Sequence, residues 1–279
     1  MRHVWGVALL VIQATADAQQ RDSSERVAKL VAQTRAATER FKDIEVAISE
    51  NYVKVGPDFP AMGEHWVRGE SVMKSVGVPM PAILTYASID GKPTLTGAVY
   101  TLILKPGEKP PSGLPAGQWH DHVGTVDEES LLIGHDHLAA GESDSLRLSV
   151  MHAWVWVANP AGAFVTDNWA LPFARLGVTP PPNASKHAAE AISLATSSSY
   201  WSRLFDAVGA LNDTESDAVL DAVEAGRDSV QKWMEGRKKV GPEDVAWLER
   251  TWMALGDRVT RSVRAESAAR LKHLFEHDM

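Results

Sequence analysis

The sequence predicts an α+β fold: an N-terminal helix packed on an antiparallel sheet or half-barrel, followed by a helical C-terminal subdomain. Three observations predict it. Apolar residues between 22 and 51 recur at three- and four-residue steps, the period of an amphipathic helix. Residues 61–182 contain short apolar runs separated by frequent prolines and glycines, a pattern typical of antiparallel strands joined by turns. Beyond the prolines at 180–182 the pattern is almost entirely helical.

The composition excludes several classes of protein. The chain has 279 residues, of which 44% are hydrophobic and 23% are charged, so it is a folded globular chain. It has no cysteine, which excludes disulfides, thiolate nucleophiles and cysteine-based metal centres. The formal net charge of -8 argues against a nucleic-acid binder, and no apolar run is long enough for an integral membrane helix. Chemistry must therefore come from histidine, carboxylate, hydroxyl or backbone groups.

The N-terminus has the pattern of a secretory signal peptide over residues 1–18. Arg2 and His3 precede a short apolar run at 4–12, and Ala16-Asp17-Ala18 fits a cleavage site. An ordinary buried N-terminal segment is the alternative. The pattern predicts export to the bacterial periplasm or secretion, which a protein without disulfides can undergo without oxidative folding.

The order of elements follows from local patterns. Strands are predicted at Ala82–Ile89 and Thr94–Leu104, joined by an Asp90-Gly91 hairpin turn, and further strands at Leu146–Val157 and Ser130–Ile133. Helices are predicted at 184–196, 199–211, 215–235 and 242–277. The prolines at 180–182 mark a boundary between a histidine-rich α+β domain at 19–182 and a helical bundle at 183–279.

Six of the ten histidines fall between His65 and His152. On a strand, His120 and His122 would point to the same face and could share one metal ion. His135 and His137 repeat this spacing, and they could equally belong to a polar surface loop.

Apolar residues surround His152. If the strand continues to Val157, then His152, Trp154 and Trp156 share one face, and the tryptophans would form a dry wall that binds a cofactor or ligand. A histidine in that setting is costly unless it is hydrogen-bonded or ligates a metal. A core histidine bonded to a backbone carbonyl is the alternative.

His65 follows the proline-rich exit of the first helix. Glu64 beside it is the candidate catalytic residue, as a general base, or a group that orients the histidine. A solvated loop acid is the alternative.

Two motifs resemble a bacterial, often exported, family of unknown function. Met62-Gly63-Glu64-His65-Trp66-Val67 resembles the family's M-G-x-H-[WY]-V motif. The stretch from His152 to Phe164 is similar to its H-x-W-x-W-x-x-N-P-x-G-x-F block. The resemblance covers roughly residues 35–170, and it implies an α+β domain and a shared use of His65 and His152. It implies no reaction, and the helical tail at 183–279 departs from the family pattern.

A second, looser resemblance is to metal-binding cupins. His120-x-His122, followed by Glu128 or Glu129 and then Gly134, is similar to their H-x-H…E…G motif, although the spacing to the acid is too long.

These observations favour a metalloenzyme in which His65, His120, His122 and His152 bind a divalent transition metal, zinc or copper. Zinc predicts hydrolase or lyase chemistry on a small-molecule substrate, and copper predicts an oxidoreductase. The alternative is a non-catalytic periplasmic binding or stress protein, because no self-sufficient catalytic motif is present. A third hypothesis is that the histidines bind nothing. The helical C-terminal region would allow a homo-oligomer.

Overall fold

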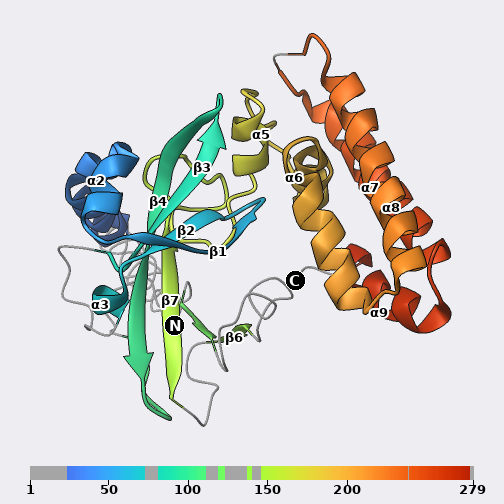
Figure 1. The fold of residues 1–279 in the computed structure, drawn as a ribbon. Coiled ribbons are helices and arrows are strands. Elements are labelled where there is room, and N and C mark those ends of the chain that lie inside the picture. The colour runs from blue at the N-terminus through green and yellow to red at the C-terminus, as the bar shows by residue number, and fades with distance from the viewer. Residues whose placement is uncertain are drawn as a thin grey trace, which may run out of the picture.

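The computed structural model describes residues 24–72, 81–110, 119–122, 137–139, 146–237 and 239–276. The predicted α+β fold is confirmed. The N-terminal helices pack on a curved antiparallel half-barrel sheet, and a C-terminal helical bundle lies beside this sheet (Figure 1). The predicted signal peptide and the predicted strand at Ser130–Ile133 lie outside the described residues. Within the described ranges, no helix is both long and apolar enough to cross a membrane.

The sheet has seven strands in the order β1-β2-β3-β4-β7-β5-β6, and every neighbouring pair is antiparallel. The strands are β1 (Val53–Phe59), β2 (Gly63–Val67), β3 (Ile83–Ile89), β4 (Lys92–Leu104), β5 (His120–His122), β6 (His137–Ala139) and β7 (Arg147–Ala153). The long β4 lies at the centre and pairs with β3 and β7 along most of its length.

The predicted hairpin is confirmed in β3 and β4. Asp90 and Gly91 have φ angles of 52° and 71°, and positive φ at both central residues is the conformation of a type I′ turn. This turn matches the twist of the two strands that it joins.

The first two strands are a correction to the sequence analysis, which read Gly56, Pro57 and Pro60 as the exit of a helix. Pro57 lies inside β1, which is an edge strand, where a missing backbone N–H breaks no ladder. The register shifts between Val55 and Phe59, which marks a bulge. Edge position and bulge therefore accommodate residues that usually interrupt strands.

The predicted helix at 22–51 is three shorter pieces: a helix over residues 24–38, the 3-10 helix η1 (Glu39–Lys42) and α2 (Ile44–Ser49). Asp43 adopts extended angles and its side chain accepts a hydrogen bond from the Glu45 N–H, so a new helix begins there. These pieces cover one face of the sheet. Leu30 packs on it, and the Thr34 hydroxyl lies 2.7 Å from that of Tyr100.

The remaining helices are α3 (Gly69–Val72), α5 (Leu171–Arg175), α6 (Lys186–Gly209), α7 (Asp213–Met234), α8 (Pro242–Arg261) and α9 (Ala265–Glu276). The two helices predicted at 184–196 and 199–211 are one helix kinked at Ser197 (φ -133°, ψ 28°), and the helix predicted at 242–277 is α8 and α9. Trp201, Phe205 and Trp252 pack in the centre of this bundle. Figure 1 shows α6 beside the sheet, with α7 and α8 on its far side.

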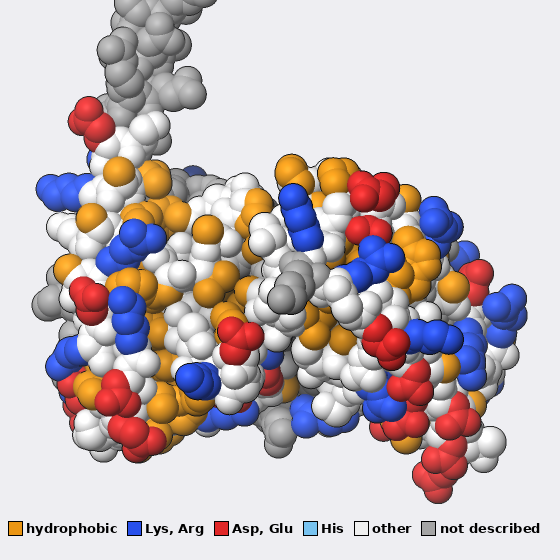
Figure 2. Space-filling model, turned by 90° about the horizontal axis from the view of Figure 1, so that it is seen from above, with side chains coloured by type: hydrophobic (Ala, Val, Ile, Leu, Met, Phe, Trp, Pro, Cys, Tyr) orange, Lys and Arg blue, Asp and Glu red, His pale blue; other side chains and the backbone are white. Residues whose placement is uncertain are grey.

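The surface agrees with the mixed composition. On the face seen from above, acidic, basic and hydrophobic side chains are interspersed over both halves of the molecule (Figure 2). The described side chains on this face form no continuous basic stripe of the kind that nucleic-acid binding needs.

Phe41 anchors the N-terminal helical pieces to the sheet. It is fully buried, and its carbonyl accepts a 2.5 Å hydrogen bond from the Tyr86 hydroxyl. Phe41→Ala should lower the free energy of unfolding by about 3–5 kcal/mol because it leaves a cavity. Ile48→Ala is the matched control, since Ile48 is 45% exposed on the adjoining helix and should cost less than about 1 kcal/mol. Chemical denaturation measures both, and equal losses would contradict this account of the packing.

Candidate functional site

Four histidines from three strands lie on one face of the sheet: His65 on β2, His152 on β7, and His120 and His122 on β5. They share this face because residues opposite each other in a ladder point the same way and alternate residues return to that side. The ring centroids of His65 and His152 are 5.6 Å apart, those of His152 and His120 are 5.9 Å apart, and those of His120 and His122 are 4.9 Å apart. The structure therefore brings together the histidines that the sequence singled out.

Sheet curvature makes this meeting possible. β3 and β4 separate β2 from β7, so in a flat sheet these two strands would lie about 14 Å apart. In the row that contains His65, the next two strands contribute Thr85 and Gly97. A Cβ on Gly97 would lie 2.4 Å from the Ala153 carbonyl oxygen, so only glycine fits. Small residues at this point leave room for the two rings to meet.

Aromatic rings enclose the histidines. Phe59 lies edge-on to His65 at 5.6 Å, and Trp154 stacks on His152 at 5.7 Å. Tyr200 of α6 packs on Phe59 at 5.8 Å, so the bundle contributes to the wall. Trp154 and His152 are both buried, which gives the site a dry side.

Trp156 does not share this face, contrary to the sequence prediction. β7 ends at Ala153, and the Trp156 N–H donates to the Thr96 carbonyl instead of continuing a ladder. The Trp156 indole N–H donates to the Thr38 hydroxyl, and the Lys42 ammonium lies 3.8 Å from the ring. Trp156 therefore packs on the N-terminal helical pieces and not beside the histidines.

Glu64 is also placed away from the histidines. It precedes His65 on a regular strand, so its side chain leaves from the opposite face. There it forms an ion pair with Lys54 at 2.7 Å and accepts a 3.1 Å hydrogen bond from the Trp66 indole. This geometry does not support Glu64 as the proton carrier of the site.

The acid whose charge reaches His65 is Asp58. Burial lowers the pKa of His65 to about 4, and the Asp58 carboxylate opposes that shift. Arg175 of α5 holds Asp58 through two hydrogen bonds of 2.8 and 2.5 Å. The sequence alone does not reveal this pair, because 117 positions separate its members and no local pattern marks either.

A buried ion pair lies behind the β5 histidines. Asp121 points to the opposite face and is paired with Arg147, and both side chains are fully buried. Arg147 also donates to the backbone carbonyls of Lys105 and Glu108. The pair thereby ties the three-residue β5 to β7 and to the end of β4. The only sequence signal for this role is that Asp121 alternates with two histidines.

The segment after the second motif adds polar groups at the edge of the site. The Thr166 hydroxyl lies 3.3 Å from Nδ1 of His120. Burial raises the pKa of the neighbouring Asp167 to about 6, although the Lys186 ammonium opposes the shift. Burial, together with the Asp167 charge, also raises the pKa of Tyr200. No sequence pattern pointed to Thr166 or Asp167.

The second predicted histidine pair is only partly described. His135 lies outside the described residues, and His137 is paired through its backbone with His122 in the β5–β6 ladder. As their side chains stand, no three His, Asp or Glu residues within the described ranges are positioned to hold a metal ion.

No protein-family model, curated protein or solved structure matches this chain. The resemblance drawn from the two motifs therefore stays a prediction.

The Asp121–Arg147 pair gives a stability prediction. Arg147→Met should lower the free energy of unfolding by about 3–5 kcal/mol, because it leaves a buried carboxylate without its counter-ion. Combining it with Asp121→Leu should restore much of that loss, since no buried charge then remains. Arg270→Met removes an exposed pair with Glu266 and should change stability by less than about 1 kcal/mol. Urea denaturation of the four proteins tests this, and a double variant as unstable as Arg147→Met would refute it.

The raised pKa of Asp167 should make the stability of the protein depend on pH. Its folded pKa, about 6, lies above the unfolded value of 3.8, so the folded state binds more protons between these values. This group's contribution to stability therefore falls as pH rises from about 4 to about 6. Asp167→Asn removes this loss, so its stability relative to the wild type should rise by about 1–3 kcal/mol between pH 4 and pH 7. Denaturation curves at both pH values measure the difference, and a constant difference would exclude the raised pKa.

Proposed function

We propose that this chain is an exported metalloprotein in which His65, His120, His122 and His152 hold one divalent transition metal ion, zinc or copper, for chemistry on a small molecule. The observation that supports this is the convergence of four imidazoles from three strands onto one curved face. His152 is buried and the other three histidines are partly buried. Imidazole nitrogens removed from water are costly unless they are satisfied, and a shared cation satisfies several of them at once.

The spacing of the rings fits such an ion. Two imidazoles bound to one tetrahedral zinc ion have centroids about 5 Å apart, given nitrogen–zinc distances of about 2.0–2.1 Å. The three neighbouring pairs, His65 with His152, His152 with His120 and His120 with His122, have separations of 4.9 to 5.9 Å. Rotation about the Cβ–Cγ bond redirects the ring nitrogens while the centroids move little, so modest rotamer changes would complete the donor set. Nδ1 of His65 is buried with no hydrogen-bond partner among the described residues, which makes it a ready ligand.

The surrounding residues would prepare this site. Thr166 would orient the His120 ring through Nδ1, as groups next to metal-binding histidines commonly do. Phe59 and Trp154 would exclude water from two sides. When bound, zinc would supply an activated water for hydrolase or lyase chemistry, and copper would supply oxidoreductase chemistry.

A non-catalytic periplasmic binding or stress protein is the second candidate. The position of Glu64 favours it, because the carboxylate expected to move protons lies on the opposite face. The Asp58 carboxylate, whose charge acts on His65, is already hydrogen-bonded to Arg175. We also propose that the chain is exported, belongs to the family that the motifs resemble, acts on a small-molecule substrate and forms a homo-oligomer.

Metal analysis of untagged protein tests the site. Wild type should bind one zinc or copper ion per chain, and His152→Ala should lose it, because His152 lies between His65 and His120. His273→Ala is the control, since His273 is an exposed residue of α9. Unchanged stoichiometry in His152→Ala would overturn the proposed site.

The same preparations separate the two candidate functions. Azide added to the copper-loaded wild type should change its visible spectrum if an exchangeable position is open, as an enzyme requires. An unchanged spectrum would favour the non-catalytic binding protein.

A further inference from the structure

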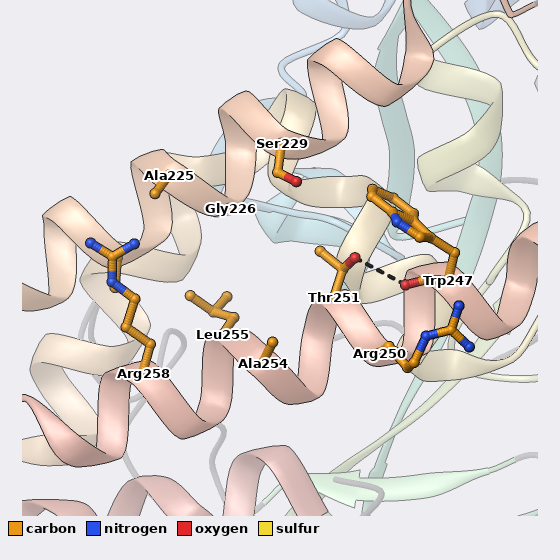
Figure 3. A pocket seen from close by; sticks show the side chains of 10 residues that line it. Ala225, Gly226, Ser229, Trp247, Arg250, Thr251, Ala254, Leu255 and Arg258 are labelled. Carbon is orange, nitrogen blue, oxygen red and sulfur yellow. Dashed lines mark hydrogen bonds between the residues drawn. The ribbon is translucent and has the colours of Figure 1, made fainter.

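A groove runs between α7 and α8, remote from the histidines. It has a volume of about 300 Å³, and small residues of both helices line it, among them Ala225, Gly226 and Ala254. Figure 3 shows Arg250 and Arg258 at its two ends, with the small residues between them. Two antiparallel helices with small side chains along their junction leave a trench that another helical surface can approach closely.

The two sides of this groove carry opposite charges. The outer side of α7 exposes four acids, Asp217, Asp221, Glu224 and Asp228, and Arg227 pairs with the last two. The outer side of α8 exposes three arginines, Arg250, Arg258 and Arg261, together with two acids, Asp257 and, at the start of the helix, Glu243.

The free charges on the two sides are complementary. Asp217 and Asp221 on α7 form no ion pair with another described residue, and neither do Arg250, Arg258 and Arg261 on α8. An acidic ridge and a basic ridge therefore lie side by side, separated by a trench of small residues.

We propose that the α7–α8 face docks on the same face of a second copy of this chain. A two-fold axis parallel to the helices places α7 of each protomer over α8 of its partner. The acidic ridge then meets the basic ridge twice, and the small-residue trench lies on the axis, where the two faces come closest. This inference is independent of the proposed metal site.

Charge complementarity selects a second copy over other occupants. An acidic partner helix would suit Arg250 and Arg258 but would meet the acids of α7, and a basic partner helix would face the reverse conflict. A second copy carries both charges in the required arrangement by symmetry. The groove is also open to the surface, whereas small molecules favour enclosed pockets.

The size of the face predicts a weak dimer. α7 has 22 residues and α8 has 20, and each helix is about 30 Å long and about 10 Å wide. The pair thus offers about 600 Å² per protomer, or about 1,200 Å² in total, at the lower limit for specific interfaces. We expect a dissociation constant on the order of micromolar that increases with salt.

Sedimentation velocity between about 1 and about 300 µM protein tests this dimer. Wild type should pass from monomer to dimer over this range. Arg250→Glu/Arg258→Glu should weaken the dimer at least tenfold, and so should Asp217→Arg/Asp221→Arg. An equimolar mixture of these two variants should form a heterodimer, because each supplies the charges that the other lacks, and this outcome also shows that both are folded.

Lys29→Glu/Lys92→Glu is the control, since it makes the same change in net charge at exposed positions far from α7 and α8 and should leave the dimer within about twofold. A wild type that stays monomeric, or a dimer that charge reversal leaves unchanged, would overturn the proposal. Binding of a synthetic acidic amphipathic peptide to a monomeric wild type would assign the groove to another protein, and it would overturn the proposal too.

Discussion

The alternation of side chains along the strands is the constraint on which this structure depends. It acts within three residues of β5, where His120 and His122 point to one face while Asp121 points to the other and pairs with Arg147. On β2 the same rule separates His65 from Glu64. One face of the sheet can therefore carry a polar cluster while the opposite face packs on the N-terminal helical pieces.

Alternation alone places the histidines on one face, but curvature makes them neighbours. Strand spacing in a flat sheet would hold β2 and β7 apart, and the half-barrel brings the ends of their side chains together above β3 and β4. Gly97 is central to this, because any side chain there would strike the backbone of β7. A substitution at Gly97 would thus act on the site without touching a histidine.

The helical bundle and the sheet share the wall of the candidate site. Tyr200 of α6 packs on Phe59, which in turn packs on His65. Arg175 of α5 holds Asp58 on β1. The kink of α6 lies at Ser197, one helical turn before Tyr200, so the direction of the second half of α6 sets where this ring meets the sheet. The bundle therefore does more than extend the chain, because it supplies groups that border the histidines.

The sequence by itself determined what depends on neighbouring residues: the hairpin at Asp90-Gly91, the helical C-terminal third and the histidines as candidates. Only the tertiary structure decided which groups meet. In the folded chain Asp58 pairs with Arg175, and Arg147 lies on the face opposite the histidines. Trp156 packs away from the histidines, and the segment that contains Pro57 is a strand. The physical reason is that strand register, edge position and sheet curvature arise from contacts between distant segments, and such contacts leave no periodic pattern in either segment.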